Sequence, residues 1–276
     1  MAASELITHR PTGTVRRHLR VARVAFVQAL GRDTQFRAQT WTTVVVGLVE
    51  VVLGLVPALL VFSRTRQVNG WDLGGVVAVA GMCQVMLAVL GAFVQPNQMK
   101  MTDYVRRGEL DGVLIRPVSA QWFTACRWMQ PSELWSGLAG ITLVVLGLHR
   151  AGIRPGPVEI IIAIGWFVAG LVLVTLVWMN LGYLAFWLES ADPVTDLVLV
   201  LLTAGRYPVA FFPIVVRVGL MFVLPVGIAT TVPVTALAGE RDPVLALIML
   251  GVLVVLAVLT RLHWVVALRR YASASS

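Results

Sequence analysis

The chain has 276 residues, of which 58% are hydrophobic and 13% charged, and its mean hydropathy is +0.84. A soluble domain has roughly a quarter of charged residues, so this composition excludes an ordinary soluble protein and indicates an integral membrane protein. The net charge of +8 is typical of a membrane protein with basic cytoplasmic loops. No basic, aromatic-rich face remains that would predict binding to nucleic acid.

Residues 1–40 open with a polar stretch in which we see no cleavable signal peptide. Apolar residues then recur at the steps of three and four that are typical of an amphipathic helix: Val15, Leu19, Ala22, Phe26 and Leu30. The other face of this helix carries arginines: Arg16, Arg17, Arg20 and Arg23. We expect the helix to lie in the membrane interface, with these arginines among anionic lipid headgroups.

A membrane-spanning helix needs about 20 mostly apolar residues. Five segments meet or approach this length: 41–62, 74–94, 132–148, 158–188 and 244–264. The third is short, and the fourth is long enough to tilt or to protrude from the bilayer.

Three polar residues inside these spans are candidates for a translocation path: Glu50, Asn180 and Tyr183. A charge near the bilayer centre is costly, so Glu50 must face protein or water. Its carboxyl group could serve a substrate path or a proton, or it could bridge two helices, and we favour the bridge. For Asn180 and Tyr183 we likewise favour hydrogen bonds between helices over contacts with a substrate.

The connector 95–131 contains the charged motif "RRGELDGVLIRP" between two apolar segments. We expect a short helix that starts at Thr102 as N-cap and ends before Pro117. Its apolar stripe (Leu110, Val113 and Leu114) would dock into a groove on a soluble partner. The alternative is a solvated loop that grips lipid headgroups, but an anionic surface would repel the acidic residues of the motif.

The stretch 194–238 is apolar, yet it is interrupted by Arg206, Arg217 and several prolines. It is too long for one span and too broken for two. We expect one crossing followed by an outer re-entrant hairpin over 207–238, with these marker residues: Tyr207, Pro208, Pro213, Pro225 and Pro233. Both arginines would then lie toward the outside, against the usual charge rule.

Arginine is most frequent in residues 1–40, in the connector 95–131 and near the C-terminal end, so these parts are assigned to the cytoplasm. With both termini inside, the number of crossings is even. The sequence therefore predicts an all-α membrane protein with six transmembrane helices in a single domain over 1–276, followed by a cytoplasmic tail over 265–276.

Sequence motifs of soluble enzymes are missing. A phosphate-binding P-loop needs a lysine after a glycine-rich turn, whereas the only lysine, Lys100, stands in "NQMKM". There is no HExxH, GxSxG or CxxC motif, and the four histidines are too scattered to predict a metal site or a catalytic pair. We expect no enzymatic activity, no cofactor and no metal on this chain.

The motif "RRGELDGVLIRP" closely resembles the loop between the second and third spans of ABC-2 type exporter permeases, in particular a subgroup of paired permeases with a separate ATPase. The segments "GRYPVAFFP", "FVLPVGIATTVPV" and "WVVALRRYASASS" agree, so that the resemblance covers nearly the whole chain. Its most specific residues are Gly108, Glu109, Leu110, Asp111, Arg116, Pro117, Tyr207, Pro208 and Leu268 to Tyr271.

The resemblance implies a half-transporter of the type V exporter kind in a bacterial cytoplasmic membrane, with both termini inside. The N-terminal helix would be a connecting helix that contacts membrane lipids, and 207–238 would cap the path on the outer face. A coupling helix would sit on the ATPase subunit, with these residues: Tyr104, Arg107, Gly108, Glu109, Leu110, Asp111, Leu114, Arg116 and Pro117.

By the same resemblance, ATP and magnesium would bind to the ATPase. A second permease chain would complete the pathway, with a sibling favoured over an identical copy. Alternating access would move a hydrophobic or amphipathic substrate, such as a drug, lipid or natural product, outward.

Two other functions stay open. An ion-coupled secondary carrier would use Glu50, although such carriers usually show repeated broken helices and only one broken region is visible. A non-transporting scaffold or an intramembrane enzyme is the other alternative.

Overall fold

The computed structural model describes residues 15–35, 37–188 and 192–274. Within these residues the chain forms helices and loops, with one isolated β-bridge between Val68 and Trp71 and no strand. The predicted all-α fold is confirmed. Five helices are long and apolar enough to cross a membrane, and they correspond to the five predicted spans: α3 (Arg37–Phe62), α4 (Leu73–Phe93), α8 (Leu134–Arg150), α9 (Pro157–Gly182) and α13 (Pro243–Ala274).

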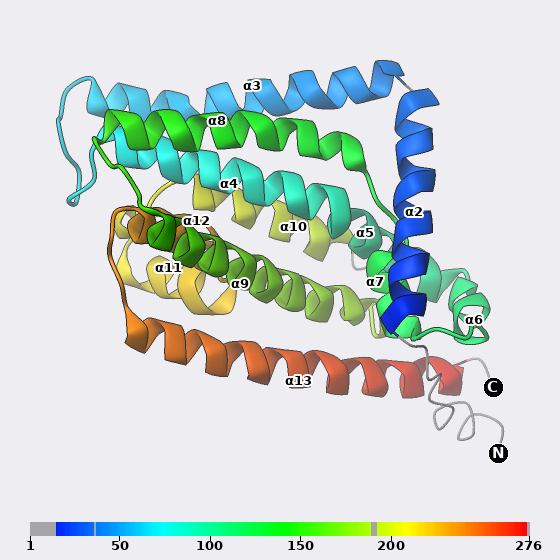
Figure 1. Cartoon of the computed structure of the whole chain (residues 1–276). Helices are drawn as coiled ribbons and strands as arrows, with labels where there is room; N and C mark the ends of the chain where they lie inside the picture. Colours follow the sequence, from blue (N-terminus) through cyan, green and yellow to red (C-terminus); the bar gives the residue numbers. More distant parts are fainter. Residues whose placement is uncertain (1–14, 36, 189–191, 275–276) are drawn as a thin grey trace.

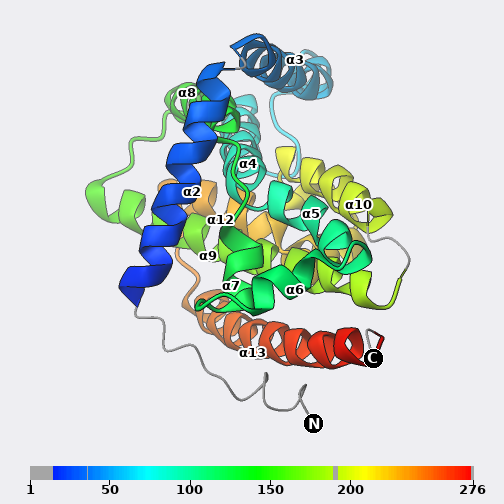
Figure 2. The ribbon, with the colours of Figure 1, turned by 90° about the vertical axis from the view of Figure 1, so that its right-hand side faces the viewer.

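These helices run side by side, so the bundle has two ends (Figure 1). One, which we name the connector end, holds the last turns of α13 and four further helices: α2 (Val15–Gln35), α5 (Gln95–Arg106), α6 (Glu109–Leu114) and α7 (Ala120–Cys126). At the opposite end, the loop end, lie the loops 63–72, 151–156 and 238–242. Because α2 and the last turns of α13 share one end, the number of crossings is even, as predicted (Figures 1 and 2).

A broken segment makes the sixth crossing. It consists of α10 (Asp192–Thr203) and two 3₁₀ turns, η3 (Ala204–Arg206) and η4 (Val209–Phe211). At the connector end the Thr102 hydroxyl of α5 donates to the Asp192 carboxylate at 2.9 Å. At the loop end the Asn69 side-chain amide donates to the Ala210 carbonyl at 2.9 Å. The segment therefore runs from one end of the bundle to the other.

The chain then re-enters the bundle from the loop end. The helix α11 (Ile214–Val218) continues into a π-helical turn, η5 (Gly219–Val223), and meets α12 (Val226–Leu237) at a bend of 96°. Val226 packs in the middle of the bundle with Cys83, whereas Leu237 packs near the loop end with Ala78 and Leu148. This is the geometry of the predicted re-entrant hairpin, although its helical part begins at Ile214.

Three of the four hairpin prolines stand at helix starts. Pro208, Pro213 and Pro225 are the N-caps of η4, α11 and α12. The expectation that Pro233 also interrupts a helix is wrong, since it lies inside α12. A proline removes one intrahelical hydrogen bond, but in membrane proteins packing against a neighbouring helix can hold the turn together. Here Ala229 of α12 lies directly against Gly170 of α9.

The helix α4 forms the centre of the bundle. In its apolar stretch 67% of the residues are buried, against 11% in both α3 and α13, which therefore face outward. Gly81 of α4 meets Gly140 of α8, where a Cβ atom on either residue would lie within 2.7 Å of the other's carbonyl oxygen. Small residues let two transmembrane helices approach this closely, and van der Waals packing then stabilises the pair.

Candidate coupling surface and polar sites in the bundle

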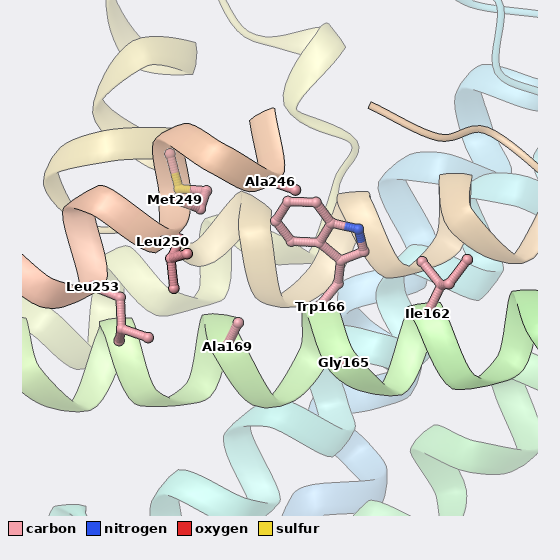
Figure 3. Close-up of a pocket in the computed structure, with 8 residues that line it drawn as sticks. All are labelled: Ile162, Gly165, Trp166, Ala169, Ala246, Met249, Leu250 and Leu253. Carbon is pink, nitrogen blue, oxygen red and sulfur yellow. The ribbon is translucent and has the colours of Figure 1, made fainter. Parts of the chain in front are cut away.

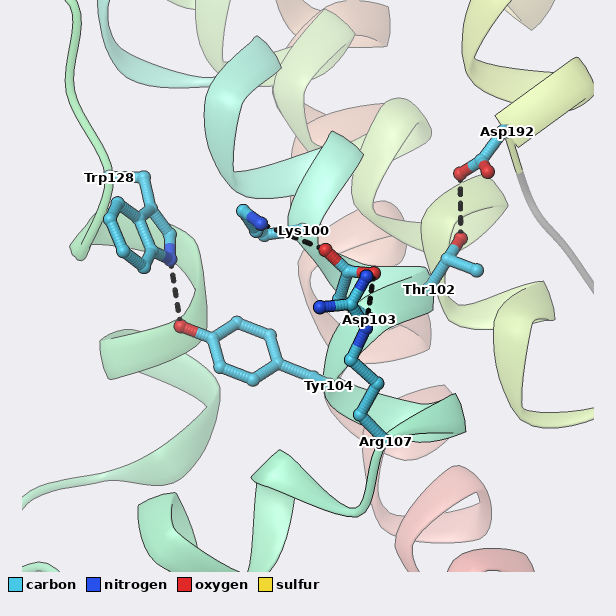
Figure 4. A network of polar contacts seen from close by, with 7 residues as sticks. All are labelled: Lys100, Thr102, Asp103, Tyr104, Arg107, Trp128 and Asp192. Atoms are coloured by element: carbon cyan, nitrogen blue, oxygen red, sulfur yellow. Dashed lines mark hydrogen bonds and ion pairs between the residues drawn. The ribbon is translucent and has the colours of Figure 1, made fainter.

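The helix that precedes the charged motif starts earlier than predicted. The sequence suggested that a helix begins at Thr102, but α5 begins at Gln95 with Pro96 in its first turn, which suits a helix start. Thr102 lies inside this helix, and its hydroxyl donates to Asp192 instead of capping the backbone (Figure 4). Asn97 is buried and bonds the backbone of Trp128 as both donor and acceptor. Packing thus holds a segment helical that was predicted as a loop.

A glycine separates α5 from α6. Gly108 has φ +67°, in the left-handed region that favours glycine. On the α5 side of this corner, the Asp103 carboxylate lies 2.8 Å from the Lys100 ammonium and 3.3 Å from the Arg107 guanidinium (Figure 4). The corner turns α6 away from the axis of α5, so that the charged motif forms a separate short helix at the connector end.

The predicted apolar stripe of α6 faces the wrong way for docking. Leu110 and Val113 are buried, and Leu114 is half-buried. They belong to what we name the connector cluster, which joins α5, α6, α7, α9 with its terminal turn, and α13: Met101, Tyr104, Leu110, Val113, Val118, Phe123, Tyr183, Phe186, Trp264 and Ala267. The stripe therefore anchors α6 to the bundle and cannot enter a groove on a partner.

The exposed face of α6 is the charged one. Glu109 and Asp111 lie in its first turn and are exposed, and Ile115, which follows the helix, is 82% exposed. Arg116 is exposed too; its guanidinium lies 4.7 Å from the centre of the Phe123 ring, and its Nε donates to the Gly112 carbonyl at 3.1 Å. We name Glu109, Asp111, Gly112, Ile115 and Arg116 the coupling surface.

Other predicted coupling residues support this surface from behind. The Tyr104 hydroxyl is buried and accepts a hydrogen bond from the Trp128 indole at 2.9 Å (Figure 4). The Pro117 carbonyl accepts one from the Arg17 guanidinium of α2 at 3.0 Å. Ile115 was not among the predicted coupling residues, because its neighbour Leu114 was assigned to the apolar stripe. The one signal in the sequence is that Ile115 is an apolar residue outside that stripe.

The helix α2 crosses the connector end (Figure 1). Its predicted apolar stripe divides: Phe26 packs near Phe93, with 6.4 Å between the ring centres, whereas Leu19 and Leu30 stay exposed. Arg17 was predicted to contact lipid headgroups but bonds the protein, since the Pro117 carbonyl is within its reach. Arg20 and Arg23 are exposed, and the predicted Arg16 contact lies outside the described side chains.

Asn180 and Tyr183 lie in a polar network between helices. The Asn180 side-chain nitrogen donates to the Thr260 hydroxyl of α13 at 2.6 Å, and its oxygen lies 3.0 Å from the His263 ring. The buried Tyr183 hydroxyl accepts from Gln121 at 3.2 Å. These bonds join α9 to α13 and α7, as expected for polar residues that hold transmembrane helices together.

Glu50 lies on α3, outside the network of Asn180 and Tyr183. Its carboxylate is 3.6 Å from the Arg206 guanidinium, which also donates to the Glu50 carbonyl at 3.3 Å. One turn further along α3, the Gly54 carbonyl accepts from the Tyr207 hydroxyl at 3.1 Å. Arg217 donates to three carbonyls of the hairpin entry, those of Val209, Ala210 and Phe212. Both arginines that opposed the charge rule are therefore neutralised or bonded locally.

The described residues show no cluster that suits a metal ion. No group of three His, Cys, Asp or Glu side chains among them could hold a metal ion. Burial raises the pKa of the Cys126 thiol, which keeps it protonated at neutral pH. A hollow of about 260 Å³ between α9 and α13 is lined only by apolar residues and glycine (Figure 3), so hydrocarbon chains suit it better than a polar ligand.

Residues 48–275 match the family described as ABC-2 family transporter protein. This match covers the second half of α3, all later spans, the coupling surface and the hairpin. No curated protein and no solved structure matches the chain.

Proposed function

The chain belongs to the ABC-2 family of transporter proteins and is a multi-pass membrane permease of an ABC transporter, and from this premise we propose that it is the permease half of an exporter. It moves a hydrophobic or amphipathic substrate, such as a drug, lipid or natural product, outward across a bacterial cytoplasmic membrane. The observation that carries the proposal is the coupling surface, a charged and exposed helix end that is fixed to the spans by the buried residues behind it.

An ABC transporter of this family has an ATPase partner. We place the coupling surface against that subunit, which binds ATP and magnesium. When the ATPase subunits close, α6 moves with them. The connector cluster carries the movement to the ends of α9 and α13, and the bond from Arg17 carries it to α2. A packed cluster transmits such a displacement because its side chains have few empty spaces to move into.

We assign the connector end to the cytoplasm. Exposed arginines of this end support the assignment, since cytoplasmic segments close to membrane spans are rich in Arg: Arg20, Arg23, Arg106, Arg107, Arg116, Arg269 and Arg270. The re-entrant hairpin then lies on the outer side and caps the path there. A second permease chain, which we take to be a sibling of this one, supplies the other half of the pathway.

The experiment compares acidic residues at the two ends of the bundle. The pair Glu109→Ala with Asp111→Ala is introduced into the chain, which is then purified with its ATPase partner in lipid nanodiscs. Glu240→Ala is the matched control, since Glu240 is exposed in the loop end. We expect the pair to lose copurifying ATPase or ATPase activity that depends on the permease, and the control to keep both. Unchanged assembly and activity in the pair would show that α6 is not the contact.

A further inference from the structure

A second, larger cavity lies inside the bundle, between α3, α4, α10 and the start of α8. Its volume is about 550 Å³, which is within the range of roughly 300–1,000 Å³ that small-molecule sites occupy. Thr42, Gln95 and Glu133 line it toward the connector end, and Gln84 and Leu202 line it deeper in the bundle. Gln84 and Gln95 are eleven residues apart, about 16 Å of chain at the helical rise of 1.5 Å per residue.

The charge of this cavity is negative. Its described lining includes two carboxylates, those of Glu50 and Glu133, and no basic side chain. Arg206 reaches Glu50 from the side of η3, but the distance of 3.6 Å is longer than the roughly 2.7–2.9 Å of a strong charge-assisted hydrogen bond. Glu133 lies beside the glycine Gly91 of α4, at the wall of the cavity. Two carboxylates against one guanidinium leave an unbalanced negative charge at the wall of the cavity.

The same cavity also has a buried hydrogen-bond acceptor without a donor. Gln84 is 5% exposed, and its side-chain oxygen has no hydrogen-bond partner. A buried polar atom without a partner is costly and needs an explanation. Gln84 lines the cavity, so a rotation of its side-chain amide would bring this buried oxygen to a ligand whose N–H group supplies the missing donor. Leu87, Leu90 and Leu199 line the same space and would contact an apolar body.

We propose that this cavity binds an amphipathic organic cation, a protonated primary or secondary amine, with its N–H group toward Gln84 and its charge balanced by Glu50 and Glu133. The binding of this ligand is inferred from the cavity alone. Its role as the inward-facing substrate site rests on the proposed export function. In the bound state the amine takes over Glu50 from Arg206, and Arg206 keeps its bond to the Glu50 carbonyl. The site therefore selects for positive charge and for an N–H donor separately.

Three matched probes separate these two requirements. Monodansylcadaverine carries a protonated primary amine and a fluorescent apolar body; its N-acetylated form is neutral, and its trimethylammonium form keeps the charge without an N–H on the cationic nitrogen. Binding to the transporter complex in nanodiscs is measured by fluorescence without ATP, against empty nanodiscs of the same lipid. We expect the amine to bind about tenfold more tightly than the acetylated probe, since each charge or donor lost is worth roughly this factor. Equal binding of these two probes would overturn the proposal.

Variants assign the effect to the residues. Replacing both carboxylates (Glu50→Gln with Glu133→Gln) should weaken the two charged probes and leave the acetylated probe unchanged. Gln84→Leu should weaken the amine but not the trimethylammonium probe, whose cationic nitrogen carries no N–H group. Glu240→Gln, at the exposed loop end, is the control and should bind all three probes as the wild type does. If the charged probes bound the double variant as tightly as the wild type, Glu50 and Glu133 would not be the charged groups of the site. The comparison of the three probes on the wild type tests the proposal even if a variant fails to fold.

Transport assays on the same complex in sealed liposomes distinguish this proposal from the export function. Selective binding of the amine without any ATP-driven movement across the membrane would support the cavity and reject the exporter. ATP-driven transport of a lipid or neutral compound, with no preference among the three probes, would support the exporter and reject the cation site.

Discussion

The Arg17 guanidinium of α2 donates to the Pro117 carbonyl at 3.0 Å, across 100 positions of sequence. Pro117 follows the coupling surface directly, so this bond joins the two segments at the connector end that the sequence presented as independent. Further bonds strengthen the connection: Arg32 donates to the Met129 carbonyl at 3.1 Å, and the Asp33 carboxylate accepts from the Ser132 amide at 2.7 Å. The helix α2 and the 117–132 segment therefore form one unit.

We expect Arg17→Ala to loosen this unit. The lost hydrogen bond is exposed, so the free energy of unfolding should fall by no more than about 1 kcal/mol. Hydrogen–deuterium exchange should, however, rise in residues 115–120, and ATPase activity that depends on the permease should fall. Arg20→Ala is the control, because Arg20 is an exposed arginine on the same helix. Equal exchange in both variants would mean that the bond to Pro117 does not hold the segment.

The corner before α6 gives a test within a single short helix. Gly108 has φ +67°, whereas Gly112 has ordinary helical geometry with open space around it. Gly108→Ala should lower the free energy of unfolding by roughly 1–2 kcal/mol, since an L side chain is strained in the left-handed region. Gly112→Ala should be neutral or stabilise α6 by up to about 1 kcal/mol. Thermal unfolding in detergent measures both, and equal melting temperatures would contradict the left-handed corner.

Much of the fold could be predicted because membrane spans are defined by length and hydrophobicity, which the sequence carries directly. The five long helices and the even number of crossings followed from apolar runs and from the distribution of arginine. The break around Pro213 and Pro225 followed from the missing N–H of proline. These features depend on neighbours in sequence, so one chain is sufficient to find them.

Features that depend on distant parts of the chain could not be predicted. The apolar stripe of α6 could face a partner or its own bundle, and only the position of Phe186 and Trp264 in the connector cluster shows that it faces inward. Likewise, Glu50, Gln84 and Glu133 come from three helical segments and meet in one cavity only when these pack together. Neither Gln84 nor Glu133 carries a local motif that marks it.

The inward orientation of α6 predicts opposite effects for two apolar residues that are five positions apart. Leu110 is fully buried and Ile115 is 82% exposed. Leu110→Ala should therefore lower the free energy of unfolding by about 2–5 kcal/mol, as for other buried leucines. Ile115→Ala should leave the melting temperature unchanged and reduce binding of the ATPase. A destabilised Ile115→Ala together with a stable Leu110→Ala would mean that α6 is turned the other way.

The contact between Gly81 and Gly140 predicts how the central helix tolerates substitution. A Cβ atom at position 140 would lie 2.7 Å from the Gly81 carbonyl oxygen and 2.8 Å from the Val85 nitrogen, both parts of the rigid α4 backbone. Gly140→Ala must therefore push α8 away from α4, and overpacking of this kind costs about 1–3 kcal/mol. Gly251→Ala on α13 is the matched control, because a Cβ atom there meets nothing within 4 Å, and it should be neutral or slightly stabilising. Thermal unfolding of both variants is measured in the same detergent. Equal melting temperatures for Gly140→Ala and Gly251→Ala would show that α4 and α8 are not packed backbone to backbone.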